Sequence, residues 1–117
     1  MAPDSLAESR QAVQAAGVAT VRPPVAVAVD LRVPMAAPLV RQRALEAFGR
    51  IDILVNCAGA TKVGDFLSFD DADWDDGFAL KFSAARRLAG VCGEDLKSGS
   101  GNLLNIVGSA GRTRGAD

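Results

Sequence analysis

The chain has 117 residues, of which 49% are hydrophobic and 23% are charged, and its net charge is −1. This composition is typical of one soluble globular domain, and the near-neutral charge argues against nucleic acid as a partner. No apolar run approaches the roughly 20 residues needed to span a bilayer, so we expect no membrane partner. The sequence contains no His and no Tyr. Their absence removes the commonest general base, most zinc ligand sets and any phenolic acid, so we expect no metal site.

Two features indicate a cytoplasmic protein. The first ten residues, "MAPDSLAESR", lack the apolar centre of a signal peptide. The chain has only two cysteines, Cys57 and Cys92, which form no disulfide framework. Each cysteine is expected to serve as a small buried hydrophobic residue rather than as a reactive thiol.

The first half of the chain predicts two helices and two strands. Ser5 and Glu8 have capping-box spacing for a helix over 5–16, which Gly17 would end. The valine-rich run "VAVAVDL", 25–31, is apolar on both faces, as buried strands of parallel sheets are. A second helix runs from about Pro38 to Phe48 and stops at Gly49. The segment "IDILVN", 51–56, is the second strand.

The second half predicts one long helix and a third strand. Ser68 and Asp71 have capping-box spacing for the helix start. Six residues then repeat at intervals of three and four, as on the buried face of a helix: Trp74, Phe78, Phe82, Ala85, Ala89 and Cys92. The segment "LLNIVG", 103–108, reads as the third strand. Strands separated by helices require crossover connections, so we expect one α/β domain over 1–117 with a parallel sheet.

Four stretches of the chain carry a resemblance to a known family. "VDL", "AFGRIDILVNCAGA", "DADWDDGFALKF" and "GNLLNIVGSAGR" together resemble the middle of the short-chain dehydrogenase/reductase family. The resemblance implies a truncated Rossmann-like parallel sheet of about three strands. It also implies an oxidoreductase that uses NAD or NADP on small alcohol or carbonyl substrates in its full-length form.

The resemblance assigns cofactor roles to residues at strand ends. It implies that Asp30 accepts a hydrogen bond from the adenine amino group, with Leu31 beside it. Asn56, Ala58 and Gly59 would line the cofactor ribose. Ligands of such sheets bind beyond the carboxyl ends of the strands, which is where these residues lie. For each, the alternative is a purely structural role in a strand-to-loop turn.

The third strand and the long helix carry the remaining expectations. Val107 would lie near the nicotinamide. The family's catalytic Ser falls on Gly108 here, so Ser109 becomes a candidate proton donor, with a simple turn serine as the alternative. The family's assisting Asn falls on Lys81, which is therefore a second catalytic candidate. Its alternative is an ordinary lysine whose stem lies along apolar surface.

Two segments that the family requires are not found in these residues. The glycine-rich phosphate loop is expected before residue 1, and the Tyr-x-x-x-Lys catalytic pair is expected after residue 117. The sequence therefore leaves two functions open. One is an oxidoreductase; the other is a catalytically inactive module for binding or oligomerisation.

The family's strand order raises a question about the sheet. In the order 3-2-1-4-5, the segments 25–31 and 51–56 are separated by two strands that this chain lacks. We expect these segments either to pair directly or to be protected by oligomerisation, because an exposed apolar strand edge promotes association. The helix from Trp74 to Cys92 is the expected surface of a homo-oligomer.

Overall fold

The computed structural model describes residues 3–16, 23–59 and 65–107. Helices and strands alternate around a small parallel sheet, so the expected α/β class is confirmed. The elements in chain order are α1 (Pro3–Ala16), α2 (Ala36–Phe48), β1 (Ile53–Asn56), the 3-10 turn η1 (Phe66–Ser68), α3 (Asp71–Phe78), the π-helical turn η2 (Ala79–Ser83), α4 (Ala84–Ser98) and β2 (Asn102–Asn105). No helix in these described parts is both long and apolar enough to cross a membrane.

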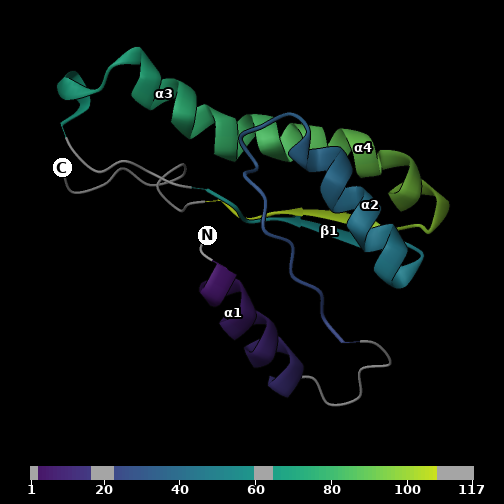
Figure 1. Ribbon diagram of the computed structural model, residues 1–117. Helices are drawn as coiled ribbons and strands as arrows, with labels where there is room; N and C mark the ends of the chain where they lie inside the picture. The colour runs from purple at the N-terminus through teal and green to yellow at the C-terminus, as the bar shows by residue number, and fades with distance from the viewer. Residues whose placement is uncertain (1–2, 17–22, 60–64, 108–117) are drawn as a thin grey trace.

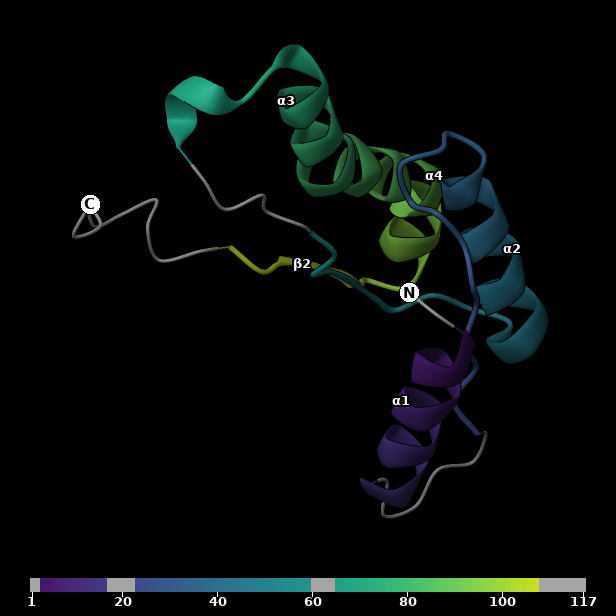
Figure 2. The same ribbon diagram turned by 60° about the vertical axis from the view of Figure 1, so that its left-hand side comes forward.

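The sheet consists of β1 and β2, which pair in parallel from Ile53 opposite Asn102 to Asn56 opposite Asn105. The chain returns from β1 to β2 through α3, η2 and α4, as a parallel pair requires. Figure 1 shows α2, α3 and α4 on one side of the two strands and α1 on the other. Figure 2 shows the same separation from a second direction. The carboxyl ends of both strands therefore open toward η2 rather than toward α1.

The core lies where α2 and α4 cover the strands. Its buried hydrophobic residues are Ala36, Ala37, Ala84, Leu88, Cys92 and Leu96. Most of them are spaced four apart along α4, so one stripe of that helix is buried. The Arg41 side chain of α2 binds Asp95 of α4 at the edge of this core, with Nε to Oδ2 at 2.7 Å and Nη2 to Oδ1 at 3.1 Å.

Helix α2 ends where the sequence predicts. Gly49 has φ of 79° in the left-handed region and donates its N–H to the Leu45 carbonyl at 2.8 Å. Glycine adopts this conformation without the steric cost that other residues meet. The helix begins at Ala36, two residues before Pro38, so proline occupies its first turn.

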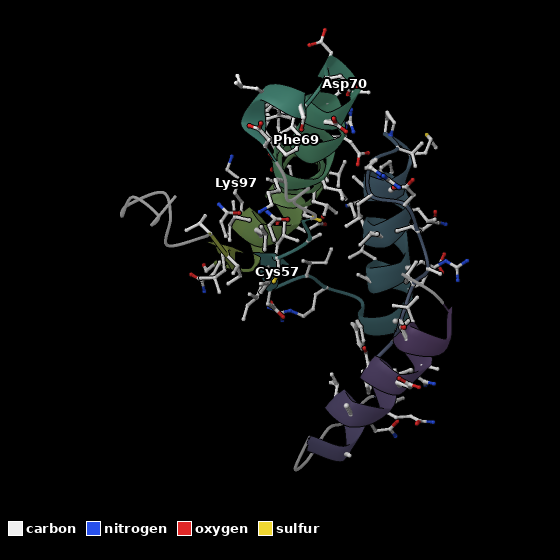
Figure 3. The ribbon with its side chains drawn as sticks, turned by 90° about the vertical axis from the view of Figure 1, so that its left-hand side faces the viewer. Cys57, Phe69, Asp70 and Lys97 are labelled. Carbon is white, nitrogen blue, oxygen red and sulfur yellow. The ribbon has the colours of Figure 1, made fainter. Side chains whose placement is uncertain are left out.

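Helix α3 begins at a different cap from the one expected. Asp70, not Ser68, is the capping residue: its Oδ1 accepts the Asp73 N–H at 2.9 Å, and Asp73 Oδ2 accepts the Asp70 N–H at 3.0 Å. Ser68 instead donates its hydroxyl to the Asp65 carbonyl at 2.7 Å within η1. Figure 3 labels Phe69 and Asp70 at this end of the helix. A second capping-box pair, two residues further along, displaces the first.

The long helical stretch is buried over only part of the predicted stripe. Cys92 is buried and Ala85 and Ala89 are half-buried. Trp74, Phe78 and Phe82 are 43%, 59% and 60% exposed. The expectation that these aromatic residues belong to the core is wrong, because α3 and η2 extend past the ends of the two short strands (Figure 1). Trp74 instead contacts Phe69 edge to face, with ring centroids 6.2 Å apart.

The segment 25–31 is not a strand, which corrects the sequence prediction. It pairs with no strand among the described residues, so the sheet has two strands rather than about three. The expectation that it pairs directly with 51–56 is therefore wrong. Instead it lies beside α1. Arg10 Nε of that helix donates to the carbonyl of Pro24, just before the segment, at 2.7 Å. A strand needs neighbours for its N–H and C=O groups, and apolar composition alone does not supply them.

Candidate functional site

A pocket of about 940 Å³ opens beside the carboxyl ends of β1 and β2. One wall consists of the strand ends and the turn after β1, and the other consists of η2 and the start of α4. Residues that matter chemically in its lining are Leu31, Asn56, Gly59, Lys81, Asn105 and Val107. The pocket thus brings together most of the residues that the sequence predicts for the site.

The turn after β1 is held close to η2. A methyl group built on Gly59 would lie 2.8 Å from Cε of Lys81 and 3.1 Å from its Cγ. The aliphatic stem of Lys81 therefore lies directly on the glycine, where a larger residue would displace it. Across the strand pair, Asn56 Nδ2 donates to Asn105 Oδ1 at 3.1 Å. Ala58 is exposed beside this contact and also lines the pocket.

Asp30 lies outside the pocket lining, next to Leu31, which is part of it. Its Oδ1 accepts hydrogen bonds from the Arg32 backbone N–H and from Arg32 Nε, both at 3.0 Å. Arg32 also donates through Nη1 to Asp76 Oδ1 at 2.8 Å, which ties the loop to α3. The hydrogen bonds from Arg32 lower the pKa of Asp30, so its carboxylate is charged at neutral pH.

The two cysteines differ in their surroundings. Cys92 is buried in the core, and this burial raises the pKa of its thiol. Cys57 is exposed at the end of β1, where Figure 3 labels it. The expectation of a buried residue is confirmed for Cys92 and wrong for Cys57, because the two-stranded sheet leaves the turn after β1 uncovered.

The remaining expected residues divide into two groups. Val107 lines the pocket and is 82% exposed. Ser109 and Gly108 lie outside the described residues. No group of three or more His, Cys, Asp or Glu side chains within the described ranges is arranged to hold a metal ion.

Sequence reasoning missed two polar residues of the pocket, Asn105 and Arg86. The signal for Asn105 was its place near the end of a strand parallel to β1, directly opposite Asn56. The place of Arg86 in the pocket could not be predicted from the sequence, because it depends on the wide π-helical turn η2 and no residue pattern predicts such a turn here.

Comparison with known proteins decides the family. The family model described as short chain dehydrogenase matches residues 3–117. The chain belongs to the short-chain dehydrogenase family. This membership confirms the resemblance and the Rossmann-like character of the fold, and it identifies the chain as a member of an oxidoreductase family.

Two curated short-chain dehydrogenase relatives illustrate the sequence similarity. The short-chain reductase protein NovJ of Streptomyces niveus is 32% identical over 84 residues, which are 71% of this chain and 32% of the relative. The 2-dehydro-3-deoxy-D-gluconate 5-dehydrogenase of Escherichia coli K12 is 34% identical over 80 residues, 67% of this chain and 32% of that enzyme. The alignments thus span about a third of the length of these relatives.

Solved short-chain dehydrogenase structures show the same fold. A candidate short-chain alcohol dehydrogenase from Sinorhizobium meliloti 1021 superposes with a TM-score of 0.82 at 29% identity, covering 96% of this chain and 43% of that one. L-sorbose reductase from Gluconobacter frateurii, solved with NADPH and L-sorbose, gives a TM-score of 0.77 at 27% identity, covering 89% of this chain and 39% of that enzyme.

Proposed function

We propose that this chain supplies the adenosine and ribose side of a nicotinamide-cofactor site, in an oxidoreductase that acts on small alcohol or carbonyl substrates. The observation that carries the proposal is the pocket at the carboxyl ends of β1 and β2, lined by both Leu31 and the Asn56–Gly59 turn. Ligands of parallel α/β sheets bind at such strand ends. The L-sorbose reductase, which shares the fold, was solved with NADPH.

The described residues fit the two ends of the nucleoside. The carboxylate of Asp30 keeps acceptor capacity beyond Arg32, because its Oδ2 makes only a longer contact of 3.4 Å to Arg32 Nη2. It is therefore free to accept a hydrogen bond from an adenine amino group. Ala58 has a small side chain and Gly59 has none, so a sugar ring can approach the backbone closely.

Val107 would lie against the nicotinamide, which supplies hydride transfer when it is bound. We propose Lys81 and Ser109 as the residues of this chain nearest to the substrate oxygen. The choice between NAD and NADP stays open in this proposal, and the titration below tests both.

The direct test is a calorimetric titration of the 117-residue chain with NADH and with NADPH. We expect saturable binding at millimolar concentration or tighter. Asp30→Ala removes the adenine acceptor and should weaken binding about tenfold or more, since a hydrogen bond to a charged group contributes about 1.5 to 3 kcal/mol. Asp71→Ala removes a carboxylate at the start of α3, outside the pocket lining, and should leave affinity unchanged.

A folded chain that binds neither nucleotide would contradict the proposal. Circular dichroism establishes folding, because the helices of α2, α3 and α4 dominate the signal. Equal loss of affinity in both variants would also contradict it, since that result indicates a general effect of charge.

A second candidate function is an inactive module for binding or oligomerisation. Trp74, Phe78 and Phe82 expose large apolar surfaces along α3 and η2, and exposed apolar patches mark interaction surfaces. We propose this stretch of helix, continuing toward Cys92, as the contact of a homo-oligomer. Sedimentation equilibrium tests it: the chain should self-associate and Phe78→Glu should restore a monomer, whereas a monomeric parent chain would exclude this contact.

A further inference from the structure

Two cations of the pocket have no carboxylate partner among the residues that the structure describes. Lys81 and Arg86 both line it, and neither forms an ion pair within the described ranges of the chain. Four other cations in those ranges do pair, whereas Arg10, Arg43 and Arg87 do not. The pairs are Arg32 with Asp30 and Asp76, Arg41 with Asp95, Arg50 with Asp52 and Lys97 with Glu94. The described carboxylates therefore leave the positive charge of Lys81 and Arg86 in the pocket unmatched.

The described part of the pocket wall carries no carboxylate. Its described lining includes no Asp and no Glu, although the chain has 14 acidic residues in total. The polar groups that accompany Lys81 and Arg86 are the amides of Asn56 and Asn105, which hydrogen-bond to each other at 3.1 Å. That bond leaves the Asn105 amide nitrogen available as a donor, because Asn105 accepts through its oxygen.

The π-helical turn η2 explains how both cations reach one pocket. In an α-helix, residues five positions apart point about 140° away from each other. The Ala84 N–H instead bonds to the Ala79 carbonyl, five residues back, so the helix is wider between them. The wider turn reduces the angle between Lys81 and Arg86 and turns both toward the strand ends. Such turns occur frequently at functional sites.

Lys81 is also placed by its stem. Its Cγ and Cε lie against Gly59, in the turn after β1. An alanine at position 59 would push this stem away. Glycine at position 59 therefore helps to position Lys81, because a residue with a Cβ would not let the lysine stem lie so close.

We propose that this pocket binds an anionic group of the substrate, a carboxylate or a phosphate ester adjacent to the reacting carbonyl. Lys81 and Arg86 supply the charge, and Asn105 supplies a hydrogen-bond donor. This inference rests on the proposed oxidoreductase function and names the substrate class within it. Lys81 and Arg86 are thus specificity residues, which select a charged substrate over a neutral one of the same size.

The test uses the isotopically labelled 117-residue chain and three probes: pyruvate for the carboxylate source, inorganic phosphate for the phosphate source, and acetone as the neutral carbonyl control. Amide chemical shifts of residues 56–59 and 105–107 report occupancy. We expect saturable shifts with one or both anions and none with acetone. The anion that binds more tightly identifies the source of the charge.

Variants separate local recognition from general charge effects. Lys81→Gln and Arg86→Gln should each weaken binding of the preferred anion up to about fivefold, as expected for an exposed charge pair. Lys97→Gln makes the same charge change on α4, outside the pocket lining, and should leave affinity unchanged. Equal weakening by Lys97→Gln, or acetone shifts equal to those of the anions, would overturn the inference.

Nucleotide binding is measured separately, so that the two proposals fail independently. Anion binding without NADH binding would leave the anionic pocket standing and would contradict only the cofactor site. NADH binding without anion binding would support the cofactor site and would contradict only the anionic pocket. Competition between pyruvate and NADH for one place would overturn the inference, because the cations would then serve the phosphates of the nucleotide.

Discussion

At the scale of single residues, close backbone contacts at the start of β2 leave no room for a side chain on Gly101. Gly101 donates its N–H to the Leu96 carbonyl at 2.7 Å, and the next residue, Asn102, donates to the Asp52 carbonyl at 2.9 Å. A methyl group on Gly101 would overlap that Asp52 carbonyl oxygen and lie 3.0 Å from the Leu96 side chain. Neither backbone can move without disturbing the register of the two strands.

We therefore expect Gly101→Ala to lower the free energy of unfolding by about 2 kcal/mol, the usual scale of overpacking. Urea denaturation followed by circular dichroism measures it. Gly90→Ala is the matched control, because nothing lies within 4 Å of a methyl group there. In that helical position alanine should raise stability by about 0.5 to 1 kcal/mol. Equal stability of the two variants would contradict the assigned contact.

The sequence predicted only some of the residues that line the pocket. The Asn56–Gly59 turn follows an apolar strand, and this local pattern predicted its place correctly. The contact between Gly59 and Lys81 joins positions 22 residues apart by their numbers. Only the family resemblance suggested Lys81, because a lysine on a helix gives no local sign of what it contacts.

At the scale of elements, helix ends are set by local chemistry and strands are not. The end of α2 at Gly49 was predictable, because a glycine by itself can adopt the left-handed conformation that ends a helix. The start of α3 was predicted two residues early, because the acidic run offers overlapping capping pairs. The segment 25–31 was predicted as a strand and is not one, since it has no strand to pair with among the described residues.

The capping pair at α3 leads to a prediction. Asp70→Ala removes the side chain that accepts the Asp73 N–H and should destabilise α3 by about 1 kcal/mol. The ¹³Cα chemical shifts of residues 71–78 should move toward coil values. Asp71→Ala serves as control: it removes an acid of the first turn without the capping bond and should cost about 0.3 kcal/mol. A larger effect of Asp71→Ala would show that the helix begins elsewhere.

The ion pair between α2 and α4 makes stability depend on pH. Hydrogen bonds from Arg41 lower the pKa of Asp95 below its usual 3.8. A carboxyl whose pKa is lower in the folded state stabilises the fold above its unfolded pKa, and this contribution disappears as pH falls through the folded value. We expect Arg41→Met to lower the urea midpoint at pH 7, and the difference from the parent to vanish well below pH 3.8.

Arg43→Met is the control for that measurement. Arg43 is an exposed cation on the same helix and forms no ion pair in the described part of the chain. It should shift the urea midpoint little at either pH. A difference for Arg41→Met that persists unchanged below pH 3 would mean that lost packing of the arginine stem, not the ion pair, is responsible.

At the scale of the whole molecule, the chain has the fold of part of a short-chain dehydrogenase. Two parallel strands, three helical segments on one face and the turn after β1 form a pocket, which we propose as part of the family's cofactor site. The α/β class and the order of elements were predictable from alternating strand and helix patterns. The number of strands was not, because each strand of a parallel sheet is stabilised by neighbours that lie far away in the sequence.

The most direct measurement is a titration of the ¹⁵N-labelled chain with NADH, followed by two-dimensional amide spectra. We predict saturable shifts confined to Leu31, residues 56–59 and Val107, with the amides of α1 unchanged. That pattern would establish that the ends of β1 and β2 form a working half of the cofactor site. A dispersed, folded spectrum that does not change with NADH, or changes centred on α1, would contradict this assignment.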